Sequence, residues 1–344
     1  MKKERLFGPD ILRACAVVLV FFIHSLNYKS NVLTSDLLSV KWFLFATVKF
    51  VSLSCVPLFM MLSGFFMHKK TLKSSYYKGI VKIVLPYIII STLSLLVRSH
   101  IYGDLFNFKS VVFSTLNYTA NGYAWYVEFY ICLFLLIPFL NSMYNALEKN
   151  KKLILILILA FITILPATLK KYVAFDTALD IIPNYWEALY PLVFYFSGAF
   201  IEEYKPKIKK YKVAITFFTV LILTVLLCAW LTHRDGAFAW YSMNGFASLA
   251  NAFIAITLFL FFYDVDINFR PIKTVVKEVS ESSFEVYLFS YITDVIVYRN
   301  CSSIYPVPVF VSFATAFVLA RILRLILDPI VMRLTKKRNK TNTQ

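Results

Sequence analysis

The sequence predicts an all-α, polytopic integral membrane protein with about ten transmembrane helices and both chain ends in the cytosol. Hydrophobic residues make up 59% of the 344 residues and charged residues 16%, whereas a soluble domain carries about 25% charged residues. The apolar residues form runs of roughly 18–25, the length with which an α-helix crosses about 30 Å of hydrocarbon. A transmembrane β-barrel would instead show short segments of alternating hydrophobicity, so the sequence excludes that class.

The expected spans follow the apolar runs in chain order. They cover roughly residues 9–28, 42–67, 79–97, 124–143, 152–169, 186–203, 213–232, 243–263, 282–298 and 307–327. The fifth is short and the second is long, and Pro57 and Gly64 are expected to interrupt the second. Gly64, next to Ser63, is also expected to permit close helix packing. We expect one transmembrane domain over residues 1–344, with a short basic cytosolic tail at 333–344.

The net charge of +17 comes from basic residues that cluster at the ends of the apolar runs. With the N-terminus inside, the cytosolic segments hold 23 Lys and Arg residues and the outer segments hold eight. Cytosolic loops of membrane proteins carry such an excess, so the bias predicts N-in, C-in and an even number of spans. Basic clusters beside spans contact anionic lipid headgroups, and we therefore expect no nucleic-acid partner.

Ionisable residues inside the spans are the first candidates for function, because they are costly in lipid. Arg13 and His24 stand eleven positions apart in the first span, so at about 100° per residue they project from one helix face, ~16 Å apart along the axis. His24 is the only histidine expected within a span. The other three, His68, His100 and His233, are expected in loops. A lone intramembrane histidine also serves in helix–helix hydrogen bonds, which is the alternative to a catalytic role.

Five segments in chain order carry further motifs. In the first, Asp10 and Arg13 form an Asp-x-x-Arg, followed by the small residues Ala14 and Ala16 and then by His24. The other four are PLFMMLSGFFM (57–67), YYKGIVKIVLPYIII (76–90), GYAWYVEFYICLFLLIPFL (122–140) and SFEVYLFSY (283–291). This series resembles the acyltransferase-3 family of integral membrane acyltransferases. The resemblance covers about residues 8–298 and includes the expected number of spans.

The resemblance implies an O-acyltransferase, most simply an O-acetyltransferase of the cytoplasmic membrane. It would move an acyl group from cytosolic acetyl-CoA, or another short acyl-CoA, to a hydroxyl of a cell-surface polysaccharide or lipid-linked glycan. A neutral histidine can take the hydroxyl proton near pH 7, so His24 is expected to be a general base or an acyl relay. Arg13, Lys78 and Lys82 are expected near the cytosolic ends of their spans, where they can neutralise the phosphates of coenzyme A. The family usually carries arginines at the positions of Lys78 and Lys82.

Two carboxylates in the spans have open roles. Glu128 is expected to orient His24 or to act as a base itself, and the alternative is an ion pair with Lys49 or Arg98. Asp294 stands near the outer end of the ninth span and is expected to be hydrated there. The five cysteines lie in or beside apolar runs without a CxxC pair, so we predict no metal site.

A transporter or flippase of a lipid-linked glycan or polysaccharide is the alternative function. It would share the helix count, the basic loops and the intramembrane charges. It should also show an internal repeat or paired broken helices, which the sequence does not display. The acyl group, the acceptor and the oligomeric state stay open, and a homodimer is compatible with the sequence.

Overall fold

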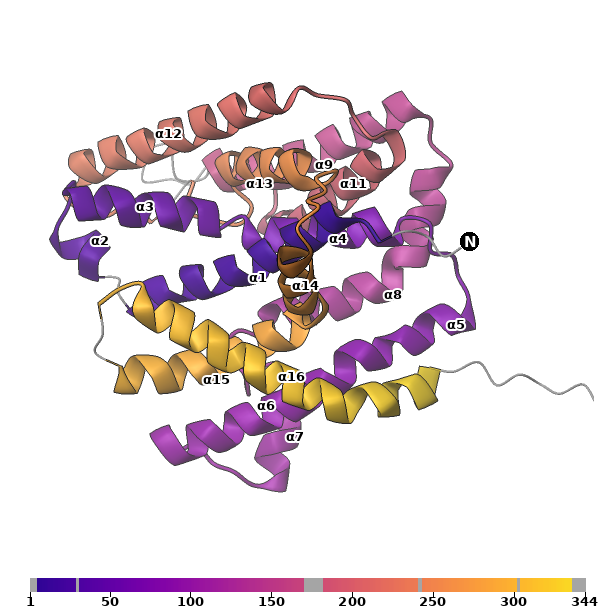
Figure 1. Ribbon diagram of the computed structural model, residues 1–344. Helices are drawn as coiled ribbons and strands as arrows, with labels where there is room; N and C mark the ends of the chain where they lie inside the picture. The colour runs from indigo at the N-terminus through magenta and orange to yellow at the C-terminus, as the bar shows by residue number, and fades with distance from the viewer. Residues whose placement is uncertain (1–4, 29–30, 170–181, 241–242, 302–303, 336–344) are drawn as a thin grey trace, which may run out of the picture. The chain divides into compact units, whose positions relative to one another are not determined.

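The fold is helical throughout the part of the chain that can be described. The computed structural model describes residues 5–28, 31–169, 182–240, 243–301 and 304–335. Within these ranges all regular secondary structure is helix and there is no strand (Figure 1). The prediction of an all-α protein is therefore confirmed.

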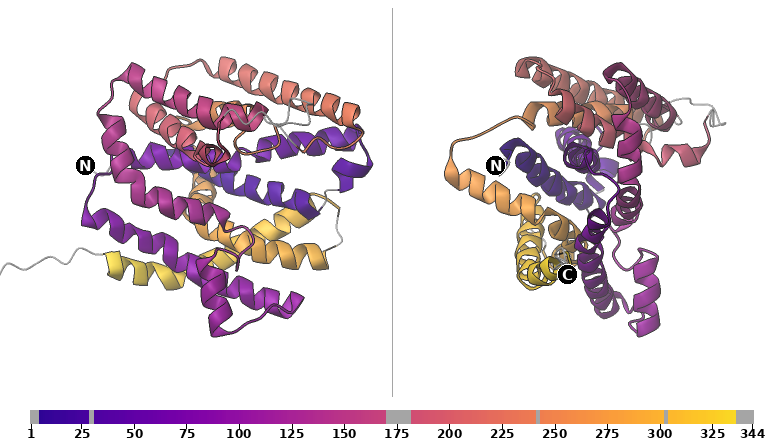
Figure 2. Two further views of the ribbon diagram at one scale, coloured as in Figure 1. Left: turned by 180° about the vertical axis from the view of Figure 1, so that it is seen from behind. Right: turned by 90° about the vertical axis from the view of Figure 1, so that its right-hand side faces the viewer.

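The chain divides into two compact units. The first unit comprises residues 1–68 and 145–283, and the second comprises 69–144 and 284–344. The helices of the first unit are α1 (Phe7–Tyr28), α2 (Asn31–Ser35), α3 (Val40–Ser52), α4 (Cys55–Met67), α9 (Lys149–Leu169), α10 (Asn184–Glu187), α11 (Tyr190–Tyr204), α12 (Lys210–Asp235), α13 (Leu249–Phe262) and α14 (Arg270–Glu281). The second unit holds α5 (Ser74–Tyr77), the 3₁₀ turn η1 (Lys78–Ile80), α6 (Val81–Tyr102), α7 (Phe108–Leu116), α8 (Trp125–Asn145), α15 (Ser283–Asn300) and α16 (Val307–Thr335). Figure 2 shows these helices from two further sides.

Every expected span contains a helix, although the eighth, expected from residue 243, becomes helical only at Leu249. Seven helical stretches among the described residues are long and apolar enough to cross a membrane. These seven are Phe7–Tyr28, Val40–Met67, Ser74–Tyr102, Trp125–Asn145, Lys149–Leu169, Lys210–Asp235 and Val307–Thr335. The remaining expected spans fall on α11, α13 and α15, which are 15, 14 and 18 residues long. The count of ten and the N-in, C-in orientation stay predictions, as does the single domain.

Three expected boundaries are corrected. The helix from Lys149 to Leu169 has 21 residues, so the fifth span is not short. Helix α16 continues to Thr335, so the first residues of the expected basic tail are helical, while residues 336–344 lie outside the described part. His100 lies in α6 and His233 in α12 rather than in loops, because both helices extend beyond their apolar cores.

The second expected span is broken, but at Leu53 and Ser54 rather than at the predicted residues. The ring of a proline clashes with the carbonyl four residues earlier, and four residues before Pro57 is Leu53. Helix α3 therefore ends there and α4 begins again at Cys55, which leaves Pro57 in the first turn, where proline is tolerated. The carbonyl of Leu53 accepts a hydrogen bond of 3.0 Å from the side-chain amide of Asn251, so the acceptor that the proline ring displaces has a donor.

Gly64 does not interrupt the helix but lets α4 and α11 approach closely. A Cβ on Gly64 would lie 1.7 Å from the carbonyl oxygen of Tyr195, and a Cβ on Gly198 would lie 1.9 Å from that of Met61. Each glycine thus faces the backbone of the other helix, a contact that any larger residue prevents. The predicted role of Gly64 in close packing is confirmed.

Candidate functional site

Helix α1 carries the central pair of candidate residues. Arg13 and His24 both lie in the unbroken helix Phe7–Tyr28, and both side chains are half-buried. The Nδ1 atom of His24 is shielded from solvent. Since no break intervenes, the eleven-residue spacing holds the two side chains on one face, ~16 Å apart along the axis. The helix therefore presents a cation near its start and an imidazole near its end.

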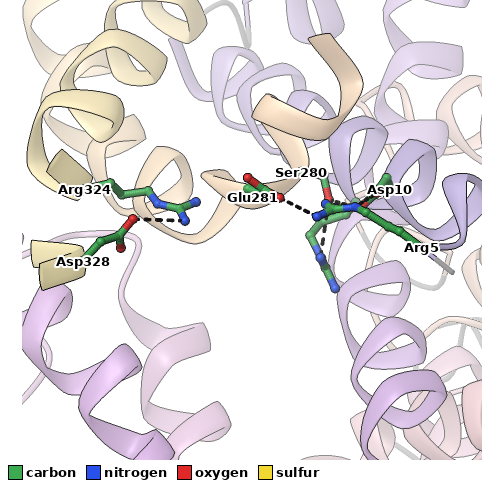
Figure 3. A network of polar contacts seen from close by, with 7 residues as sticks. Arg5, Asp10, Ser280, Glu281, Arg324 and Asp328 are labelled. Carbon is green, nitrogen blue, oxygen red and sulfur yellow. Dashed lines mark hydrogen bonds and ion pairs between the residues drawn. The ribbon is translucent and has the colours of Figure 1, made fainter. Parts of the chain in front are cut away.

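The start of α1 is fixed by a polar cluster that α14 completes (Figure 3). The buried carboxylate of Asp10 accepts hydrogen bonds from Ser280 Oγ at 2.6 Å and from Arg5 at 2.5 and 2.9 Å. Arg5 also pairs with Glu281. The two parallel bonds from one guanidinium make the Arg5–Asp10 contact directional as well as strong. The hydrogen bond that Arg5 donates to Asp10 raises the pKa of Arg5 above its ordinary value, so Arg5 keeps its charge at any pH at which proteins fold.

Arg13 is oriented by the same cluster and by α4. Its Nη1 donates to Ser280 Oγ at 3.4 Å, and its guanidinium carbon lies 5.2 Å from the ring centroid of Phe66. The Ser280 contact uses one of the five N–H donors of a guanidinium. Asp10 thus acts on Arg13 through Ser280, which bridges the carboxylate and the cation. The side chain is directed by contacts from two helices and not by its rotamer preference alone.

The other predicted phosphate ligands belong to the second unit. Lys78 lies in the turn η1 and Lys82 in the first turn of α6, and both are exposed. Tyr76, just before them, stacks on the ring of Phe134 with centroids 4.6 Å apart and donates from its hydroxyl to the Phe134 carbonyl at 2.7 Å. These contacts fix the start of the long helix against α8. That Lys78 and Lys82 act together with Arg13 stays a prediction.

Glu128 lies in the first turn of α8, also in the second unit, and is exposed. One of its two predicted ion-pair partners is engaged elsewhere, because Arg98 lies 2.5 Å from Asp104 and donates to the carbonyl of Thr119 at 2.6 Å. A role for Glu128 in orienting His24 stays a prediction.

Asp294 was expected to be hydrated, and this is wrong. Its side chain is 1% exposed. It accepts hydrogen bonds from Ser312 Oγ at 2.5 Å and from the Tyr123 hydroxyl at 3.2 Å. Ser312 on α16 reaches Asp294 because α15 and α16 pack against each other, which the position of Asp294 near a helix end could not reveal.

Two further contacts, each made by a buried basic side chain, hold α11 in the first unit. His68, which ends α4 and is buried, lies 3.0 Å from Glu202 through Nε2 and 3.2 Å from the Gly64 carbonyl through Nδ1. The ammonium of Lys152 lies 2.7 and 2.9 Å from the two oxygens of Glu203. The adjacent acids Glu202 and Glu203 could have indicated these contacts in the sequence, since consecutive acids at the end of an apolar helix need cations nearby.

These observations define a multi-pass helical membrane protein whose first helix holds an anchored arginine and a shielded histidine. The chain belongs to the acyltransferase-3 family, because the family model described as an acyltransferase domain matches residues 6–325, nearly the whole chain. No curated protein and no solved structure matches the sequence. The resemblance drawn from the five motifs is therefore confirmed, and family and fold together identify a membrane acyltransferase.

Proposed function

We propose that this protein is an O-acyltransferase, most simply an O-acetyltransferase, of the cytoplasmic membrane. It transfers the acyl group of a cytosolic acyl-CoA to a hydroxyl of a cell-surface polysaccharide or a lipid-linked glycan. The observation that carries the proposal is the placement of Arg13 and His24 on one unbroken helix in a chain that belongs to an acyltransferase family.

Arg13 suits the phosphates of the donor. A guanidinium binds phosphate through two parallel N–H donors, and the contacts with Ser280 and Phe66 hold this one in place. With the predicted orientation, this end of α1 faces the cytosol, where acyl-CoA is made. The extended pantetheine arm of the donor spans the ~16 Å of helix that separates Arg13 from His24. Lys78 and Lys82 are proposed to add charge to the same phosphates.

His24 is proposed to carry the proton transfer. As a general base, its imidazole takes the proton of the acceptor hydroxyl while the oxygen attacks the thioester carbonyl. The C–S bond then breaks, and coenzyme A leaves as a thiolate that takes up the proton. As an acyl relay, an imidazole nitrogen attacks first and the acceptor hydroxyl then displaces it. In both schemes one ester forms and one thioester is lost, and no metal takes part.

The test uses membranes that contain equal amounts of wild type, His24→Ala and His233→Ala. Transfer of label from radioactive acetyl-CoA into lipid-linked and polymeric glycan is measured. We expect label with wild type and with His233→Ala, an exposed histidine on α12, and a loss of at least about a hundredfold with His24→Ala. Equal label in all three would remove His24 from the chemistry. No label from any of them, with several acyl-CoA donors and native glycan present, would favour a glycan transporter.

A further inference from the structure

Two buried lysines in the first unit have opposite surroundings. Lys152 is 4% exposed and pairs with both oxygens of Glu203. Lys49 is 5% exposed, yet its ammonium lies over aromatic rings, 4.5 Å from the ring centroid of Trp240 and 5.5 Å from that of Phe238. A buried cation ordinarily has an anionic partner. Lys152 follows that rule, whereas Lys49 has no carboxylate partner among the residues that the structure describes.

Lys49 lies deep in its helix rather than at an end. It is the tenth residue of α3, about 14 Å along the axis from Val40 at ~1.5 Å per residue, so it cannot reach the headgroups by extending its side chain. No carboxylate of the described residues lies within ion-pair distance of it. The titratable side chain that faces it is the thiol of Cys228, which bonds to Thr232 and Asn244. A thiol is an ordinarily neutral group at pH 7 and does not balance the charge.

The segment before α13, which carries Phe238 and Trp240, is irregular backbone at membrane depth. Helix α13 has 14 residues and is ~21 Å long, less than the ~30 Å of hydrocarbon. Residues 236–240 and 243–248, which precede it, therefore share the crossing. Non-helical backbone occurs at this depth only where protein buries it or where it lines a hydrated space. Side chains bond to two of the backbone groups in this segment: Thr232 accepts from the Ala239 amide at 3.3 Å, and Asn251 donates to the Phe246 carbonyl at 3.0 Å.

The two rings over Lys49 differ in exposure. Phe238 is buried in the core formed by α3, α12 and α13, whereas Trp240 is 50% exposed. The buried ammonium of Lys49 thus lies beside a ring that is half exposed at the surface of the unit. The indole offers a flat apolar surface beside an ammonium that has no carboxylate partner in the described part of the chain. With the predicted orientation, both Val40 and the end of α12 lie on the outer side of the membrane.

We propose that Lys49 and Trp240 bind an anionic group of the acceptor, so that the acceptor is an acidic glycan or a glycan carried on a lipid phosphate. This inference rests on the proposed function. The ammonium of Lys49 pairs with the carboxylate or phosphate, and the Trp240 ring packs against the part of the acceptor next to that group. The anion supplies the counter-charge that Glu203 supplies to Lys152.

The experiment measures binding by the full-length protein in phosphatidylcholine nanodiscs without an acyl donor. One probe pair is hexagalacturonate and its methyl ester, followed by calorimetry. The other is decaprenyl phosphate and decaprenol, followed by native mass spectrometry. The variants are Lys49→Gln, Lys49→Arg and the matched control Lys152→Gln. We expect the charged member of one pair to bind wild type at least about tenfold more tightly, the size of one charge-assisted hydrogen bond. That preference should disappear in Lys49→Gln and remain in Lys49→Arg and Lys152→Gln.

The pair that shows the preference identifies the source of the anion. Equal affinity of wild type for both members of both pairs overturns the inference, and so does a preference that Lys49→Gln retains. If Lys49→Gln is not monodisperse, Trp240→Phe takes its place: weaker binding of the charged member supports the site, and unchanged binding refutes it. Charge-selective binding without any labelled transfer would refute the proposed function alone. Transfer without charge selectivity would refute this inference alone.

Discussion

The close contact between α4 and α11 predicts how much stability a single added methyl group would cost. Substituting Gly64→Ala places a methyl group 1.7 Å from a backbone oxygen. Real Cβ atoms essentially never approach closer than 3.0 Å, so the helices must separate by about 1.3 Å. A side-chain rotation cannot relieve the clash, because the obstructing atom belongs to the backbone of Tyr195.

Overpacking of this kind costs about 3 kcal/mol at the upper end of its range, and the better helix propensity of alanine returns about 1 kcal/mol. The net loss is about 2 kcal/mol. For a unit of about 200 residues, this lowers Tm by about 4–8 °C. The measurement is thermal unfolding of the detergent-purified protein, followed by intrinsic fluorescence.

The matched control is Gly79→Ala, where the added methyl would meet the Phe134 ring at an ordinary 3.5 Å, and its Tm should stay within about 1 °C of wild type. The double variant Gly64→Ala/Gly198→Ala should lose clearly less than the sum of the two single variants, because one separation of the helices relieves both clashes. A Tm for Gly64→Ala within about 1 °C of wild type, or fully additive losses, would refute the reasoning.

Three more outcomes follow from the same unit. Asp10→Asn removes the negative charge and one of the two oxygens that accept from Arg5, and it should cost about 2 kcal/mol, seen as a lower Tm; an unchanged Tm would mean that the cluster adds no net stability. His68→Ala removes the buried imidazole that contacts Glu202 and the Gly64 carbonyl and should cost about 2 kcal/mol, while a loss below about 0.5 kcal/mol in urea or thermal unfolding would mean that these contacts add no net stability. If the proposed function holds, Arg13→Lys should raise KM for acetyl-CoA about tenfold and leave kcat nearly unchanged, because an ammonium cannot bind a phosphate through two parallel donors. A fall in kcat alone would show that Arg13 does not act by binding the donor.

The positions of the helices could be predicted from the sequence because each apolar run is long enough to specify its own span. The pairing of Arg13 with His24 on one face was equally accessible, since it depends only on helix periodicity within one segment. The break in the second span was predicted from the correct residue, Pro57, but at the wrong place. Proline acts on the carbonyl four positions earlier, so the discontinuity falls at Leu53.

The contacts that fix the site were not accessible in this way. Ser280 lies 270 positions after Asp10, and nothing in the local pattern of α14 selects that hydroxyl. Asp294 was misjudged for the same reason, because its depth in the helix does not report that Ser312 and Tyr123 converge on it. The surroundings of Lys49 depend on irregular backbone before α13, where hydrophobic periodicity carries no signal.

The ionic contacts of α11 impose an order on biosynthesis. Glu202 reaches His68 on α4, and Glu203 reaches Lys152 on α9, so both acids meet partners that were made earlier. At about 5–20 residues per second, the ribosome needs roughly 7–27 s to proceed from His68 to Glu202. For that interval the contact between His68 and Glu202 cannot form. Helices α4 and α9 therefore gain these two contacts only once α11 has been made.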